Sequence, residues 1–254
     1  MNHFLLPNSI QKMSKENQKL DFDEEAKKLW ARLNLDPNSL NRGLWNHVDP
    51  IYKHPTGNGQ IFVGNQTAAE NLSFLKSLNI THIVNCTYGH SKIPNFHEKH
   101  LKYYTFAISN WQSFVNSTNA SILAFIDPLF RFIDDAIEKG ENVLVHCLAG
   151  AHRAGTTGCA CLMHYANLDV PTAISTAKSL RPIIDPIGQL PEFLHRFKRA
   201  QDYRKQQTQQ QTISSTSSSS SSSSIPPSSQ AKEVEGQDKN DIRKIFIDNL
   251  GKKF

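Results

Sequence analysis

The 254-residue sequence has few cysteines and no long apolar run. Its four cysteines, Cys86, Cys147, Cys159 and Cys161, do not form the dense framework of small disulfide-bonded domains, so we expect free thiols. No apolar run approaches the roughly 18–20 residues that cross a membrane. The first residues also lack the charged start and apolar stretch of a secretory signal. These absences predict no membrane span and a cytoplasmic or nuclear location.

The sequence also lacks a dense block of lysine and arginine. The formal net charge is +5 and the pI is about 9.0, but the basic residues are spread along the whole chain. This distribution predicts mild attraction to anionic ligands and argues against a nucleic-acid partner.

Composition divides the chain into four segments. Residues 1–48 are a polar extension, apart from FDEEAKKLWARLNL at 22–35, whose apolar residues recur at helical spacing and predict a short helix. Residues 49–204 hold most of the apolar runs and form the predicted domain. Residues 205–230 are rich in Gln and Ser and have little to bury, so we expect them to be disordered. Residues 231–254 are a charged tail that ends in a predicted amphipathic helix, a candidate docking segment for a partner.

Strands and helices alternate within the predicted domain. The predicted strands are residues 60–64, 81–86, 103–108 and 142–145, and the later predicted helices are residues 122–137, 154–166, 171–180 and 190–203. Thr67-Ala68-Ala69-Glu70 is a capping-box pattern that predicts a further helix, with Leu72, Leu75 and Leu78 facing inward. NVLV at 142–145 is wholly apolar, as expected in the middle of a parallel sheet. The alternation predicts an α/β fold with a central, mostly parallel sheet flanked by helices.

The turn after the last predicted strand, HCLAGAHR at 146–153, carries the clearest chemical pattern. It leaves the strand at the carboxyl end, where α/β sheets bind ligands. Gly150 lets backbone N–H groups form an anion-binding concavity, and the helix that starts near Arg153 adds the positive end of its dipole. Arg153 can hold two oxygens of a phosphate. Cys147 lies at the base of the same turn, where its thiolate is positioned to attack a bound phosphoryl group.

His-Cys, five residues and Arg resembles the signature of the protein tyrosine phosphatase superfamily, and Ala-Gly at 149–150 resembles its dual-specificity branch. Residues 59–86 and 181–197 are similar to that family's opening strand-helix-strand unit and its closing Arg-Pro segment. The resemblance implies a phosphatase-like fold, no metal and no cofactor. It also implies that Cys147 is the nucleophile, that Arg153 binds phosphate and that His146 orients the loop through hydrogen bonds. The loop residues that would bind the substrate are Leu148, Ala149, Gly150, Ala151 and His152.

Two positions depart from the family's pattern. Ala154 stands where the family usually has Ser or Thr, so the resemblance implies slow breakdown of a phosphocysteine unless Thr156 supplies the hydroxyl. Asn110 aligns with the family's Asp general acid, and an amide cannot donate a proton and regain it. If that alignment is displaced, Asn110 is an ordinary turn residue. The next aspartate, Asp127, falls inside a predicted helix and too far along the chain.

The sequence therefore favours hydrolysis of phosphotyrosine, and with it phosphoserine or phosphothreonine, in phosphoproteins. A lipid-phosphate substrate is disfavoured because no Lys lies between Cys147 and Arg153. The main alternative is a phosphoprotein-binding pseudophosphatase with little turnover, which Asn110 and Ala154 favour. A redox or sulfur-transfer function is disfavoured, because it gives no role to Arg153. A zinc site is disfavoured because the nearby His and Cys residues lack paired ligand spacing.

Overall fold

The computed structural model describes residues 20–33 and 46–217 of the chain. In this part, one sheet has five strands in the order β1-β2-β5-β3-β4. The strands are β1 (Val48–Lys53), β2 (Gln60–Gly64), β3 (Ile80–Asn85), β4 (Lys102–Thr105) and β5 (Asn142–His146). β1 pairs antiparallel with β2, and the other pairings are parallel. The structure confirms the predicted α/β fold with a mostly parallel sheet and places β5 in its centre.

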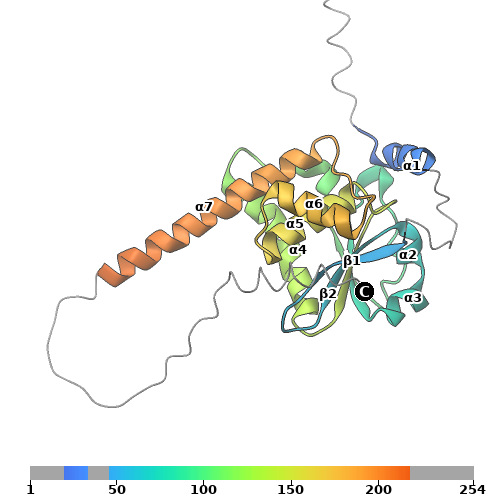
Figure 1. Ribbon diagram of the computed structural model, residues 1–254, viewed down its shortest axis with the longest axis horizontal. Helices are drawn as coiled ribbons and strands as arrows, with labels where there is room; N and C mark the ends of the chain where they lie inside the picture. The colour runs from blue at the N-terminus through green and yellow to red at the C-terminus, as the bar shows by residue number, and fades with distance from the viewer. Residues whose placement is uncertain (1–19, 34–45, 218–254) are drawn as a thin grey trace, which may run out of the picture.

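Helices cover both faces of this sheet (Figure 1). They are α1 (Phe22–Arg32), α2 (Gln66–Glu70), α3 (Leu72–Ser77), α4 (Asn119–Ile137), α5 (Arg153–Tyr165), α6 (Val170–Leu180) and α7 (Leu190–Ser217), with short 3-10 helices η2 (Gly89–Ser91) and η3 (Ile108–Ser113). Helices α4, α5 and α7 pack together on one face, and α2 and α3 lie on the other. Every helix in the two described segments is too short or too polar to cross a bilayer.

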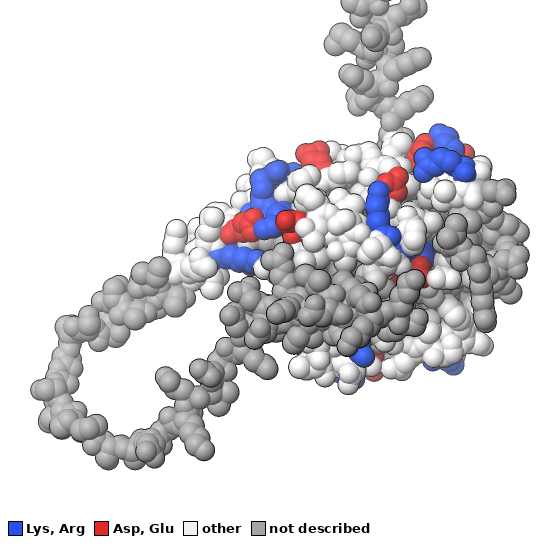
Figure 2. All heavy atoms as spheres, viewed as in Figure 1, with Lys and Arg blue, Asp and Glu red and all other residues white. Residues whose placement is uncertain are grey.

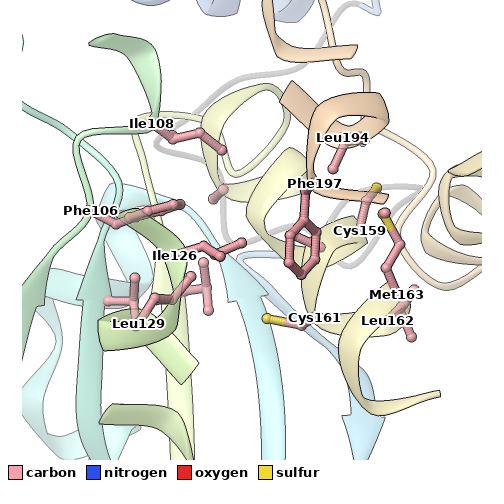
Figure 3. Close-up of a cluster of buried hydrophobic side chains, with 14 of the residues drawn as sticks. Phe106, Ile108, Ile126, Leu129, Cys159, Cys161, Leu162, Met163, Leu194 and Phe197 are labelled. Atoms are coloured by element: carbon pink, nitrogen blue, oxygen red, sulfur yellow. The ribbon is translucent and has the colours of Figure 1, made fainter. Parts of the chain in front are cut away.

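Apolar side chains fill the space on both faces of the sheet. Val143 and Val145 of β5 belong to the larger cluster, whereas Leu144 belongs to the smaller cluster that includes Leu75 of α3. This alternation follows from the two-residue period of a strand, and the burial of every β5 residue agrees with its apolar sequence. Figure 3 shows side chains of α4, α5 and α7 meeting in the larger cluster.

The strand β1 at the edge of the sheet is not predicted by the sequence. Pro50 argues against a strand at this point, because proline cannot donate a ladder hydrogen bond. It is tolerated because β1 is an edge strand, and its register with β2 shifts next to Pro50. The strand predicted at 103–108 is shorter than expected and ends at Thr105, since the chain then turns into η3.

The helical segment after β2 starts earlier than the capping-box pattern predicts. Its N-cap is Asn65, whose side chain accepts a hydrogen bond from the N–H of Ala68. The segment also divides at Asn71, which accepts from the N–H of Phe74 and begins α3. Each asparagine therefore starts a helix of its own, because its short side chain satisfies N–H groups that have no partner within the helix.

Helix α7 continues beyond the predicted domain boundary. It runs to Ser217, so residues 205–217 are helical where the composition predicts disorder from residue 205. Its first part is anchored by buried residues such as Phe193 and Phe197, and its end projects from the body of the protein (Figure 1). Once a helix is anchored, residues with good helix propensity such as Gln and Lys extend it easily. The remaining low-complexity residues and the predicted C-terminal helix lie outside the described residues.

Candidate active site

Cys147 and Arg153 lie at the two ends of one loop beside the centre of the sheet. Cys147 directly follows β5, and Arg153 is the first residue of α5. Both residues are only 2% exposed. His152, the N-cap residue of α5, makes no capping hydrogen bond with its side chain, so within the described ranges the leading N–H groups of α5 remain available to an anion. The structure places this loop where the sequence predicts an anion-binding turn.

The carbonyl groups of this loop are bound by residues outside it. The hydrogen bonds run from Gln66 N–H to Leu148 O (3.1 Å), from Arg181 Nη2 to Ala149 O (3.1 Å), from Arg181 Nε to Gly150 O (3.0 Å) and from Asp185 N–H to Ala151 O (3.1 Å). Within the described part of the chain, the N–H groups of residues 148–152 donate to no protein acceptor. With its carbonyls engaged elsewhere, the loop offers its N–H groups to a ligand.

Arg181 is a positioning residue that no sequence pattern singles out by itself. It is 1% exposed, and besides the two loop carbonyls it donates to Asn46 O (2.9 Å) and to Asp49 Oδ2 (2.6 Å). Burial lowers the pKa of this guanidinium, and the Asp49 carboxylate opposes that shift. The sequence signal for Arg181 is its place in the closing Arg-Pro segment, but its distant partners are not visible there.

Gly150 fits the loop because its backbone has φ = +69°, a conformation that favours glycine. An added Cβ would lie 2.5 Å from the carbonyl oxygen of Gly64 and 2.8 Å from Nη2 of Arg181. A larger residue would therefore push the loop away from both β2 and the arginine that holds its carbonyls.

The side chain of Arg153 faces α1, the helix of the N-terminal extension. Its Nη2 forms an ion pair with Oδ1 of Asp23, and its guanidinium carbon lies 5.8 Å from the centre of the Phe22 ring. Arg153 Nε is buried and has no hydrogen-bond partner among the described residues. The predicted phosphate-binding arginine is thus held by a carboxylate of this chain and still has a free donor.

Asp127, the aspartate that follows Asn110 in the sequence, and Asp185, next to the loop, both pair with basic side chains. Asp127 Oδ2 lies 2.6 Å from Nη2 of Arg204 on α7, and Asp185 Oδ1 lies 3.1 Å from Nζ of Lys178. Asn110 lies in η3, where its Oδ1 accepts a hydrogen bond from the Ser109 hydroxyl at 3.0 Å. The assignment of Asn110 to the general-acid position stays a prediction.

Neither Ala154 nor Thr156 directs a hydroxyl group to Cys147. Ala154 is fully buried and packs in the same apolar cluster as Cys147. The Thr156 hydroxyl donates to the carbonyl oxygen of His152 at 2.6 Å, a hydrogen bond within the helix. The structure therefore does not support the prediction that Thr156 supplies the missing hydroxyl.

The two histidines of the loop, His146 and His152, have different environments. Burial lowers the pKa of His146 to about 4, although a hydrogen bond with the backbone of Cys147 opposes that shift, so its ring is neutral. The predicted role of His146 in orienting the loop stays a prediction. Nδ1 of His152 lies 2.6 Å from the carbonyl oxygen of Asp185. Because a carbonyl only accepts, His152 donates from Nδ1 and ties the loop to the segment before α7.

The other cysteines are core residues. Burial raises the pKa values of Cys86, Cys159 and Cys161, so these thiols stay neutral. All are free and fully buried, and Cys86 Sγ lies 3.3 Å from the Thr157 hydroxyl oxygen. In the described ranges, no group of three or more His, Cys, Asp or Glu residues has the arrangement of a metal site.

Known proteins with a similar sequence point to one family. Residues 61–200, more than half of the chain, match the family model "Dual specificity phosphatase, catalytic domain". Mouse dual specificity protein phosphatase 19 is 34% identical over 141 residues, which cover 56% of this chain and 59% of the relative. The Drosophila melanogaster dual specificity protein phosphatase MPK-4 is 30% identical over 139 residues, covering 55% of this chain and 34% of the relative. The chain thus spans less than two thirds of either relative.

Two solved structures also match part of the chain, with TM-scores below 0.5. The human tyrosine phosphatase-like serine/threonine/tyrosine-interacting protein has a TM-score of 0.45 and 23% identity, over 55% of this chain and 91% of that one. A mouse putative dual specificity phosphatase has a TM-score of 0.47 and 21% identity, over 65% of this chain and 96% of that one.

Proposed function

Since this chain belongs to the dual-specificity phosphatase family, we propose that it hydrolyses phosphomonoesters of phosphoproteins through a phosphocysteine at Cys147. The substrates are phosphotyrosine and, with lower rates, phosphoserine and phosphothreonine. The observation that supports this proposal is the loop itself. Its carbonyls are bound from outside, and a buried cysteine and a buried arginine stand at its two ends.

In the first step, the Cys147 thiolate attacks phosphorus and the bond to the leaving oxygen breaks. The N–H groups of the loop and the guanidinium of Arg153 donate to the equatorial phosphoryl oxygens, where negative charge is stabilised in the transition state. The N–H groups of the loop are fixed before the substrate arrives, because Arg181 and the backbone N–H of Asp185 hold the loop carbonyls.

In the second step, water attacks the phosphocysteine, inorganic phosphate leaves and the thiolate is restored. Ala154 provides no hydroxyl to stabilise the departing thiolate, so we expect this step to be slow. The first step is limited in another way, because a positioned acid typically contributes about 10²–10⁴-fold to such a transfer and Asn110 cannot act as one. Leaving groups that are stable as anions should therefore react fastest.

The alternative function is binding of phosphoproteins with little turnover. Asn110 and Ala154 favour it, since each removes a group that assists one chemical step while the donors to phosphate remain. Both functions need the same loop, so binding alone does not separate them.

The test is phosphate release by the full chain from an activated aryl phosphate and from tyrosine- and serine-phosphorylated peptides. Cys147→Ser is the control variant, because it keeps the loop and removes the nucleophile. We expect the wild type to release phosphate and Cys147→Ser to bind the phosphopeptides without releasing it. Wild-type hydrolysis that survives in Cys147→Ser contradicts the mechanism. Phosphopeptide binding without any release in the wild type favours the binding function.

A further inference from the structure

Helix α1 covers the loop that forms the candidate active site. Asp21 caps the helix by accepting hydrogen bonds from the N–H groups of Asp23 and Glu24. The buried face of α1 includes Ala26 and Leu29, which are 2% and 5% exposed. These side chains form one cluster with residues of the loop and of the closing segment, namely Ala149, Ala151 and Ile183. The other face of α1 carries charged side chains at the surface (Figure 2).

Asp23 is the acidic residue of α1 that turns toward the loop. Its side chain is 24% exposed and pairs with Arg153, whose side chain is 3% exposed. By contrast, the Glu24 side chain is 54% exposed and pairs outward with Lys27 at 2.6 Å. A carboxylate offers an arginine the same kind of charged oxygen acceptor as a phosphate does. Asp23 thus binds Arg153 in the way expected of a substrate phosphoryl group.

We propose that α1 is an autoinhibitory segment whose Asp23 takes the place of a phosphate oxygen on Arg153. A dianionic phosphate and the Asp23 carboxylate repel each other and compete for the same guanidinium, so the substrate binds only when α1 leaves the loop. The proposal rests on the proposed function in one respect, namely that this loop is the phosphate site.

The docking of α1 on the loop is reversible. An 11-residue helix is marginally stable by itself in water, so α1 loses its helical structure when it leaves the loop. Docking is therefore an all-or-none event that needs both the apolar cluster and the ion pair. If about 1–10% of molecules have an open loop, the apparent affinity for phosphate is about 10–100-fold below the intrinsic affinity.

The experiment compares Asp23→Asn with Glu24→Gln in the full chain. Both substitutions remove one negative charge from the first turn of α1, but only Asp23 touches Arg153. Inorganic phosphate is the probe, and its affinity is measured by calorimetry and by protection of Cys147 from iodoacetamide. We expect Asp23→Asn to bind phosphate about 10–100-fold more tightly and to lower KM for an aryl phosphate by a similar factor. Glu24→Gln should change the affinity by about twofold at most.

Leu29→Glu provides a second variant that leaves the Asp23 carboxylate in place. It puts a charge into the apolar cluster under α1, detaches the helix and should tighten phosphate binding in the same direction. Unchanged phosphate affinity in both Asp23→Asn and Leu29→Glu overturns the autoinhibitory role, whatever the activity. Tighter phosphate binding in both variants without hydrolysis by any of them upholds this role and overturns the proposed phosphatase function.

Discussion

Replacement of Arg181 by methionine tests whether hydrogen bonds from Arg181 to the loop carbonyls hold the active-site loop in place. The guanidinium is 1% exposed and donates to Ala149 O, Gly150 O and Asp49 Oδ2, so the substitution leaves these acceptors without their donor. Removing one partner of a buried ion pair typically costs about 3–5 kcal/mol. The Asp49 side chain is 11% exposed, which allows some hydration of the orphaned carboxylate. We therefore expect the free energy of unfolding to fall by about 3 kcal/mol, the lower end of that range.

A double variant separates the ion pair from the loop contacts. Arg181→Met combined with Asp49→Leu removes both charges, and apolar residues often replace a buried ion pair without loss of stability. Most of the lost stability should therefore return. The carbonyls of Ala149 and Gly150 still lack their donor, so we expect the loop to be displaced in both variants. A misplacement of about 1 Å can reduce a rate by about 10²-fold, and we expect kcat/KM to remain low by roughly that factor.

The assay is urea unfolding of the wild type and both variants, together with kcat/KM for an aryl phosphate. Recovery of both stability and activity in the double variant would refute the reasoning, because it would mean that Arg181 matters only as the partner of Asp49. Full stability of Arg181→Met alone would also contradict it.

Two further predictions concern the missing acid and the buried histidine. Asn110→Asp should raise kcat/KM by about 10²–10⁴-fold for poor leaving groups and far less for activated aryl phosphates. A leaving-group series measures this, and an equal gain across the series would show that position 110 does not supply the proton. His146 is neutral in the folded state because burial lowers its pKa to about 4, whereas the unfolded chain protonates it near its ordinary value of about 6.5. Neutral His146 therefore contributes to the free energy of unfolding above pH 6.5. This contribution, in total about 3 kcal/mol, is lost as the pH falls toward 4. Over this pH range the free energy of unfolding should fall by that amount more in the wild type than in His146→Asn. Parallel pH profiles of the two proteins would contradict the assignment.

The central part of the site could be predicted from the sequence because its causes are local. An apolar run such as NVLV forms a buried strand in any α/β sheet, and the small residues that follow it permit a tight turn into a helix. Cys147 and Arg153 are fixed by their places at the two ends of that turn. The amphipathic pattern of residues 22–35 likewise predicts α1, because helical spacing of apolar residues requires a buried face.

The partners of these local elements could not be predicted, because they depend on contacts between distant segments. Arg181 is 132 residues from Asp49, and Arg153 is 130 residues from Asp23. The pattern in α1 shows that one face is buried but not which surface covers it. Helix α7 illustrates the opposite error, since a low apolar content predicts disorder only when no anchored helix precedes the segment.

The two buried arginines of the site, Arg181 and Arg153, differ in their partners. This difference explains how the loop can be rigid while α1 covers its phosphate-binding arginine. Arg181 is surrounded by acceptors of the domain itself, so its contacts persist whether or not a ligand is present. Arg153 has a free Nε, and its ion pair comes from the separate helix α1. When α1 leaves, a buried guanidinium loses its counter-charge, and this loss favours re-docking of Asp23 or binding of a phosphate. Because the two anions exclude each other, each must weaken the binding of the other by the same factor. The empty protein is thus stabilised by the same contact that opposes its substrate, and any change that opens the site should lower the stability of the ligand-free chain.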